Sequence, residues 1–158
     1  MSDGFTHLDE SGRPRMVDVG DKPVTSRMAV AEGWVRMSAS ALDAVAKGQV
    51  KKGDVLRIAE LAGVQGAKRA SDLIPLCHPI PLDAVRVTVC AEADGVHIQA
   101  VARAHWRTGV EMEALTGVMA GLLCVWDLVK PLEKDEAGQY PETRIHNVEV
   151  VEKLKGEG

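Results

Sequence analysis

Residues 84–102 read AVRVTVCAEADGVHIQAVA, and this stretch decides the fold class. Its first half carries valine at every second position, between polar or small side chains, as a half-buried strand does. Asp94-Gly95 is a strong signal for a hairpin turn. Residues 96–102 then supply a returning strand with apolar residues again at alternate positions. The centre of the chain is therefore predicted to form an antiparallel β-hairpin.

The pattern outside the hairpin predicts one strand and two helices before it, and one helix and one strand after it. These elements are a strand at residues 27–37, a helix capped by Ser40 and ended by Gly48, a helix capped by Asp54, a long helix from about Gly109 to Lys130 that Pro131 ends, and a strand at residues 144–151. The order is that of a split βαβ unit with a helix added. We therefore predict an α+β fold with a ferredoxin-like antiparallel sheet, helices on one face and one additional helix.

The composition indicates a single domain that spans residues 1–158. The apolar fraction is 46% and the charged fraction 27%, which are ordinary values for a globular chain. Residues 1–24 lack clear periodicity and are expected to be extended or mobile, and residues 152–158 form a polar tail that is expected to fray. The start of the chain lacks the apolar segment of a signal peptide, and no run approaches the roughly 18 apolar residues of a membrane span. A cytoplasmic protein is expected.

Aromatic residues make up only 3% of the chain, which argues against a binder of single-stranded nucleic acid and against an RNA-binding α+β module, since both stack bases on rings. The formal net charge is −4, but the stretch from Lys47 to Arg69 holds six basic residues against two acids. This cluster fits a small phosphorylated ligand or a solvated helix face, and both interpretations remain open. The three cysteines and the scattered histidines indicate neither a disulfide framework nor a metal site, so no metal is predicted.

Five residues of the long helix fall on one stripe because they are spaced by four, three, four and three positions: Glu113, Gly117, Ala120, Cys124 and Asp127. The small residues among them permit close approach by another helix or by a ligand. Asp127 stands among apolar neighbours in the sequence and is expected to need a partner, and Lys130, one turn later, is the natural one. Such a pair is either structural or an acid–base couple. Glu113 and Asp127 are 14 residues apart, or about 21 Å along a helix, so a site that uses both is expected to be shared between subunits.

Two further segments carry candidate ligand-binding side chains. The stretch SDLIPLCHPIPL at residues 71–82 is stiff and apolar, and loops of that kind often position function. Its His78 is compatible with a general acid, a phosphate donor or a buried structural histidine. Lys51 and Lys52 precede the Asp54 cap, at a helix N-terminus that favours anions. These residues by themselves indicate an oligomeric α+β domain that binds a phosphorylated small molecule.

The segments THLDESGRPRMVDVGDKPVTSR, KKGDV, GVQGAKRASDLIPLCHPIPL, TGVEMEALTG and WDLVK occur in this order along the chain. Together they closely resemble the cyclic pyranopterin monophosphate synthase family, MoaC. The likeness covers roughly residues 6–135, and LIPLCHP and TGVEMEALT are highly specific to the family. The ending that starts at Tyr140 matches only some members, so no site residue is carried over from it.

The resemblance implies a lyase of molybdenum cofactor biosynthesis. Its reaction converts 3′,8-cyclo-7,8-dihydroguanosine triphosphate into cyclic pyranopterin monophosphate and releases diphosphate. The resemblance also implies a homo-hexamer, a trimer of dimers, with active sites at subunit interfaces and with no nucleic-acid or membrane partner. No cofactor is implied, and although Mg²⁺ could accompany the triphosphate, no carboxylate cluster in the sequence demands it. The alternative is a non-catalytic, nucleotide-sensing ferredoxin-like oligomer, which would bind its ligand without converting it.

The resemblance further implies roles for single residues. Asp127 is similar to the catalytic acid–base residue of the family, with Lys130 beside it, and Lys52 is similar to a second catalytic group. The matches to the substrate-binding positions of the family are Leu76, Cys77, His78, Met112 and Glu113, together with the cations Arg27 and Lys68, which are expected to meet the triphosphate.

Overall fold

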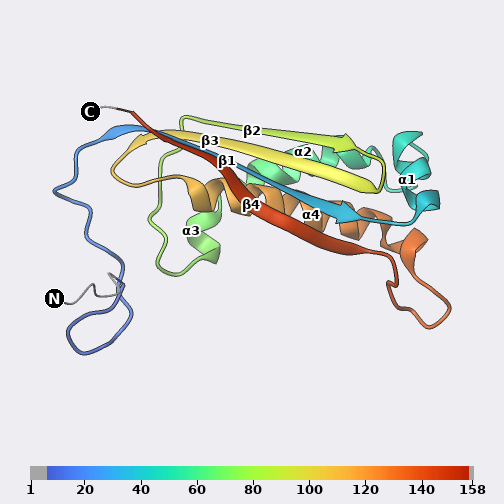
Figure 1. The fold of residues 1–158 in the computed structure, drawn as a ribbon, viewed down its shortest axis with the longest axis horizontal. Coiled ribbons are helices and arrows are strands. Elements are labelled where there is room, and N and C mark those ends of the chain that lie inside the picture. The colour runs from blue at the N-terminus through green and yellow to red at the C-terminus, as the bar shows by residue number, and fades with distance from the viewer. Residues whose placement is uncertain (1–6, 157–158) are drawn as a thin grey trace.

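The computed structural model describes residues 7–156 and has one four-stranded antiparallel sheet with its helices on one face (Figure 1). The elements in chain order are β1 (Thr25–Arg36), α1 (Ala39–Ala46), α2 (Val55–Ala67), α3 (Ala70–Leu73), β2 (Ala84–Ala91), β3 (Gly95–Trp106), α4 (Glu111–Glu133) and β4 (Arg144–Lys155). The strand order across the sheet is β2-β3-β1-β4, as in a split βαβ unit. The predicted α+β, ferredoxin-like fold class is confirmed, and the four-residue helix α3 is an addition that the sequence pattern did not indicate.

β2 and β3 form the predicted hairpin and are paired along the whole length of β2. Gly95 is required at the start of β3, because a Cβ atom there would collide with the carbonyl oxygen of Val35 on β1. The carbonyl oxygen of Asp94 accepts a hydrogen bond from the backbone N–H of Met37 at 3.3 Å. The hairpin turn is therefore fixed against the end of β1, which pairs with β3 on one side and with β4 on the other.

The core lies between the sheet and the two long helices, α2 and α4. Small residues of the central strands, such as the fully buried Ala100, leave room for α4 on the sheet. Glycines bring the two helices together: a Cβ atom at Gly66 would collide with that of Ala120, and one at Gly117 would lie 3.1 Å from the carbonyl oxygen of Gly63. Of the two interpretations of the small-residue stripe, the structure therefore supports a helix–helix contact.

The N-cap of α1 is Ser38 and not Ser40, so that prediction was wrong. The Ser38 hydroxyl accepts a hydrogen bond from the backbone N–H of Ala41 at 3.2 Å. The same serine donates to the carboxylate of Glu133 through both its backbone N–H and its hydroxyl group. The sequence offered two serines two positions apart, and the contact with the far end of α4 selects the first.

α4 continues through Pro131 to Glu133, although the proline was predicted to end it. Proline lacks the N–H that would donate to the carbonyl oxygen of Asp127, so one helical hydrogen bond is missing. The last turn stays helical because tertiary contacts hold it. Glu133 is buried and accepts hydrogen bonds from the hydroxyl groups of Ser38 and Thr143, the latter at 2.6 Å.

β4 extends to Lys155, beyond the strand end predicted at Val151. The added residues pair with the first half of β1, so the expectation of a frayed tail at residues 152–158 is wrong for its first four residues. Backbone pairing with a neighbouring strand does not require apolar side chains, which is why a polar sequence concealed it. The last two residues of that tail, and residues 1–6 of the N-terminal segment, lie outside the described residues.

By length and composition alone, α4 is apolar enough to cross a membrane, which corrects the expectation that no run in the chain approaches that length. Charged residues interrupt the apolar sequence of α4, so no long apolar run is visible in it. The mean hydropathy of the helix nevertheless stays high. Half of its most apolar 18-residue window is buried inside the fold, against the sheet and α2. This is typical of the core helix of a globular domain.

Candidate active site

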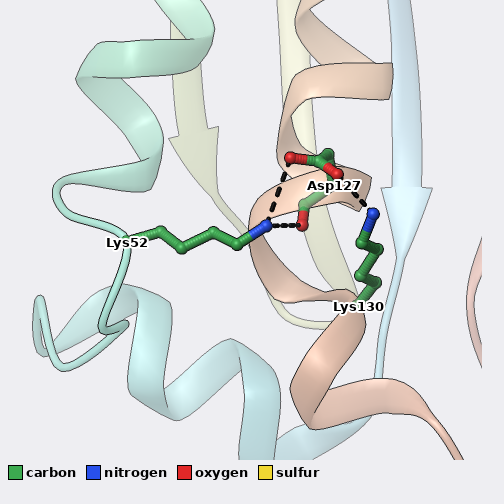
Figure 2. Close-up of polar contacts among 3 residues, drawn as sticks. All are labelled: Lys52, Asp127 and Lys130. Atoms are coloured by element: carbon green, nitrogen blue, oxygen red, sulfur yellow. Dashed lines mark hydrogen bonds and ion pairs between the residues drawn. The ribbon is translucent and has the colours of Figure 1, made fainter.

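A carboxylate held between two ammonium groups lies near the C-terminal end of α4 (Figure 2). Lys130 Nζ, one helical turn further along, donates to Asp127 Oδ1 at 2.6 Å. Lys52 Nζ, from the connection between α1 and α2, donates to Asp127 Oδ2 at 3.3 Å and to the backbone carbonyl oxygen of Asp127 at 2.9 Å. The three residues predicted as the catalytic group are therefore in direct contact within one chain. We call them the lysine–aspartate half-site.

The residues that follow Lys52 set the course of the chain at this contact. Gly53 has a φ of +113°, a backbone conformation that favours glycine. Asp54 then caps α2 by accepting a hydrogen bond from the backbone N–H of Arg57 at 3.2 Å, which confirms the predicted cap. The turn lets the Lys52 side chain extend toward α4, as Figure 2 shows. Its ammonium group is therefore engaged with Asp127.

The pair is exposed, which corrects the expectation that Asp127 sits in apolar surroundings. Its side chain is 56% exposed, because a helix turns about 100° per residue and the buried neighbours Val125, Leu128 and Val129 point to other faces. The hydrogen bonds from Lys130 and then Lys52 hold the pKa of Asp127 below its ordinary value, and the Asp127 carboxylate raises the pKa of Lys130. Neighbouring charges, and not burial, therefore hold Asp127 as a carboxylate and Lys130 as an ammonium group.

A cavity of about 440 Å³ adjoins this pair. Its lining comes from α4, from the connection after α4 and from β4: Leu123, Trp126, Asp127, Lys130, Tyr140 and Ile145. The rings of Trp126 and Tyr140 lie 5.5 Å apart between centroids, in a tilted arrangement, and form an aromatic wall. Sequence reasoning gave Tyr140 no role in the site, because its segment has no periodicity and only the fold brings it to α4.

A second group of predicted residues meets near the N-terminal end of α4. The Cys77 thiol, from the proline-rich loop at residues 71–82, donates to Glu113 Oε1 at 3.8 Å. Glu113 is 3% exposed, and its Oε2 has no hydrogen-bond partner among residues 7–156. Burial raises the pKa of the Glu113 carboxyl group, and burial together with the charge of Glu113 raises the pKa of Cys77 to about 11. The thiol is therefore protonated at neutral pH and acts as a hydrogen-bond donor, not as a nucleophile.

A cavity of about 360 Å³ borders this second group. Its walls are the N-terminal segment, the proline-rich loop and the start of α4: His7, Val17, Val19, Lys22, Leu76, Cys77, His78, Ile80, Thr108, Gly109, Glu111 and Met112. His78 Nε2 lies 2.7 Å from the carbonyl oxygen of Val17 and ties the N-terminal segment to the loop. Lys22 and His7 contribute a cation and an imidazole that sequence reasoning had missed. We call Leu76, Cys77, His78, Met112 and Glu113 the loop half-site.

The two other predicted cations have separate surroundings. Arg27, on β1, donates to the carbonyl oxygens of Trp106 and Arg107, both at 3.4 Å, and so holds the end of β3. Lys68 is the C-cap residue of α2 and is exposed. Within residues 7–156, no hydrogen bond or ion pair links either cation to one of the two half-sites.

The two half-sites lie at opposite ends of α4. Glu113 and Asp127 are 14 residues apart, which is about 21 Å along the helix. In Figure 1 the segment that follows α3 lies at one end of the molecule, and the connection between α1 and α2 lies at the other. The residues predicted from the sequence are therefore gathered into two places and not into one site within a single chain.

Among the described residues, the cysteines and acidic side chains form neither a disulfide nor a metal-binding cluster. Cys77, Cys90 and Cys124 are free, and burial followed by the charge of Asp127 raises the pKa of Cys124. In the described part of the chain, no group of three or more His, Cys, Asp or Glu side chains is placed to hold a metal ion. The chemistry that the described side chains themselves offer is proton transfer by a carboxylate and an ammonium group, and anion binding by lysines.

Comparison with known proteins gives matches over nearly the whole chain. The model for the MoaC family matches residues 16–156. The probable cyclic pyranopterin monophosphate synthase of Pyrococcus horikoshii is 49% identical over 155 residues, which cover 98% of this chain and 97% of the relative. Its counterpart in Thermococcus kodakarensis is 50% identical over 153 residues, with 97% of each chain covered. A probable cyclic pyranopterin monophosphate synthase accessory protein of Methanothermobacter thermautotrophicus is 46% identical over 151 residues, which cover 96% of this chain and 94% of the relative.

Proposed function

Because the chain belongs to the MoaC family, as its motifs indicated, we propose that it is a cyclic pyranopterin monophosphate synthase of molybdenum cofactor biosynthesis. Relatives that carry this name are about half identical to it over almost their full length. The proposed reaction is that of a lyase. It converts 3′,8-cyclo-7,8-dihydroguanosine triphosphate into cyclic pyranopterin monophosphate and releases diphosphate.

The observation that carries this proposal is the geometry of the lysine–aspartate half-site. Rearranging a purine-derived ring requires protons to move between nitrogen, carbon and oxygen atoms, which is the work of paired acid and base groups. Asp127 is held as a carboxylate and Lys130 as an ammonium group, because each stabilises the charged form of the other. Lys52 adds a second positive charge on the same carboxylate, so the half-site as a whole attracts phosphate groups.

The loop half-site supports binding of the remainder of the substrate. Its cavity is walled in part by Lys22, which offers a positive charge to phosphate oxygens, and by His78, which holds the N-terminal segment against the loop. Arg27 and Lys68 are proposed to meet the triphosphate as well. Forming a cyclic phosphate while diphosphate leaves requires cations opposite the leaving charge, because negative charge builds up on that group.

We further propose that each active site lies between two copies of the chain. A substrate that meets both half-sites must bridge two subunits, because one chain holds them about 21 Å apart along α4. A homo-hexamer built as a trimer of dimers provides such shared sites, and the sheet face without helices is available for one of its interfaces. The assembled enzyme is proposed to work in the cytoplasm and to bind neither nucleic acid nor membrane.

The first test is turnover by the purified protein. Incubation with the cyclised triphosphate is expected to release diphosphate and to yield a pterin chromophore. Asp127→Asn and Lys130→Ala are each expected to lower kcat by about 100- to 10,000-fold while folding and assembly stay intact, because each removes one of the proton-transferring groups. Diphosphate release, circular dichroism and sedimentation velocity measure the three properties.

The matched control is Asp43→Asn, which breaks an equally exposed ion pair, Asp43 with Lys47 at 2.7 Å, on α1. Its kcat is expected to equal that of the parent protein. Ligand binding without any diphosphate release by the parent protein would instead support the nucleotide-sensing alternative. Near-normal turnover by Asp127→Asn would reject the role assigned to the carboxylate.

A further inference from the structure

Pro131 stands inside α4 at the position whose backbone N–H would donate to the carbonyl oxygen of Asp127. In an α-helix the N–H of each residue donates to the carbonyl oxygen four residues earlier, and the residue four positions before Pro131 is Asp127. Proline has no N–H, so the Asp127 carbonyl oxygen receives no hydrogen bond from that position. The acceptor that is left open in this way is the one that Lys52 Nζ occupies, at 2.9 Å.

We propose that Pro131 is a positioning residue for Lys52: by withholding a helical donor, it leaves the Asp127 carbonyl oxygen as the anchor for the lysine ammonium group. This inference rests on the proposed function, in which Lys52 is a catalytic group. The distances support it, because Lys52 Nζ lies closer to the carbonyl oxygen, at 2.9 Å, than to the carboxylate oxygen Oδ2, at 3.3 Å. Figure 2 shows the lysine extended across the gap between its loop and α4 to reach both atoms.

The backbone anchor matters because it does not titrate. When Asp127 accepts a proton in the proposed reaction, its side chain loses the negative charge that attracts both lysines. Lys130 bonds to the side chain alone, at Oδ1, and is then free to move. Lys52 remains attached to the carbonyl oxygen in either protonation state. Lys52 therefore keeps its position while protons are transferred, and its positive charge stays available to the phosphate groups.

The proline is unfavourable for the helix in every other respect. Inside a helix it removes a hydrogen bond and its ring crowds the preceding turn. The last turn of α4 persists because Glu133 is buried and bonded to Ser38 and Thr143. A residue that weakens its own element while it shapes a neighbouring site is expected where function, and not stability, determines the sequence.

The deciding variant is Pro131→Ala. Alanine restores the N–H that competes with Lys52 for the Asp127 carbonyl oxygen, and it improves the helix. The thermal unfolding midpoint is therefore expected to rise while kcat falls by about tenfold, the effect of weakening one hydrogen bond to a charged group. In parallel, acylation of Lys52 by a water-soluble succinimidyl ester, followed by peptide mass spectrometry, is expected to become faster. A purely structural proline would give the higher midpoint without the other two changes.

The matched control is Leu132→Ala, an exposed change in the same helical turn that keeps the proline, and its kcat and Lys52 acylation are expected to match the parent protein. Unchanged kcat and unchanged Lys52 acylation in Pro131→Ala would overturn the inference. The acylation rate does not depend on turnover. If the parent protein fails to release diphosphate, the proposed function is rejected, and the labelling of Lys52 still decides whether Pro131 positions it.

Discussion

Glu113 and Asp127 belong to one stripe of α4 and yet have opposite surroundings. Glu113 is buried under the proline-rich loop, and that burial raises the pKa of its carboxyl group. Asp127 is exposed, and two lysines lower its pKa. The surroundings therefore shift the first carboxyl group toward its neutral form and the second toward its charged form, so two carboxyl groups on one stripe differ in their chemistry.

The raised pKa of Glu113 predicts a pH dependence of stability. The folded chain binds this proton more tightly than the unfolded chain, whose glutamates titrate near the ordinary value of 4.5. The stabilisation is thus complete below that value and is lost as the pH rises through the folded-state pKa. Glu113→Gln removes this loss and is expected to raise the free energy of unfolding at pH 7 by on the order of 1 kcal/mol, with no gain at pH 4. Urea titrations at the two pH values measure it.

The comparison for this prediction is Glu136→Gln, at an exposed glutamate in the connection after α4. That variant is expected to follow the parent protein at both pH values. A Glu113→Gln protein that is less stable than the parent at pH 7 would mean that the ionised carboxylate is stabilised in the folded state, contrary to its burial without a partner for Oε2.

The positions of the two long helices, α2 and α4, depend on glycines, which have no side chain to keep the helices apart. α2 and α4 approach so closely that backbone atoms of one face glycines of the other. This contact fixes α4 across the sheet, and α4 in turn holds a half-site near each of its ends. The distance between the half-sites is therefore set by a rigid, packed helix and not by a loop that can adjust.

Gly66→Ala tests this contact. On an exposed helix face the change would stabilise the helix by about 1 kcal/mol. Here the added Cβ atom would collide with Ala120 and lie 2.9 Å from the carbonyl oxygen of Thr116, so a net loss of about 1–3 kcal/mol in the free energy of unfolding is expected. The control is Leu61→Ala, on the exposed side of α2. It shortens a large side chain but is expected to change the free energy of unfolding by less than about 0.5 kcal/mol. A higher urea midpoint for Gly66→Ala than for the parent would contradict the close contact.

The whole molecule carries its candidate functional residues at the two ends of its helical layer. The helices cover one face of the sheet, and the half-sites lie near opposite ends of α4 (Figure 1). No movement within a folded helix brings the two ends together, because its length is fixed by its hydrogen bonds. The proposed catalysis therefore depends on assembly, which is a property of several copies and not of the single chain.

Mixed oligomers test whether the sites are shared. Asp127→Asn and His78→Ala are each expected to be inactive, since each removes one half-site. When the two inactive proteins are unfolded together and refolded at equal amounts, random pairing in dimers is expected to restore roughly a quarter of the parent activity, because half of the dimers are mixed and each of these has one intact site. Diphosphate release measures the recovery. A mixture as inactive as its components would show that each chain uses its own residues alone.

Some features of this protein follow from the sequence because local interactions determine them. Alternating valines before Asp94-Gly95 can only be buried on one side of a hairpin, and Asp54 caps α2 through an N–H three residues away. Element order then limits the fold to a split βαβ arrangement. The family motifs are continuous segments, so they also indicate Asp127 and Lys130 as candidate site residues. These two residues lie one turn apart on the same helix, which brings their side chains within hydrogen-bonding distance.

Other features required the tertiary structure, because they join residues that no local pattern connects. Lys52 and Asp127 are 75 positions apart, and only the packing of the α1–α2 connection on α4 brings them together. Likewise, only the contacts of Glu133 with Ser38 and Thr143 keep α4 helical through Pro131. The periodicity of a sequence predicts which face of a helix or strand a residue occupies. Its burial and its long-range contacts depend on which other elements cover that face. The surroundings of the candidate site were therefore decided by the fold, whereas its residues had already been indicated by the sequence.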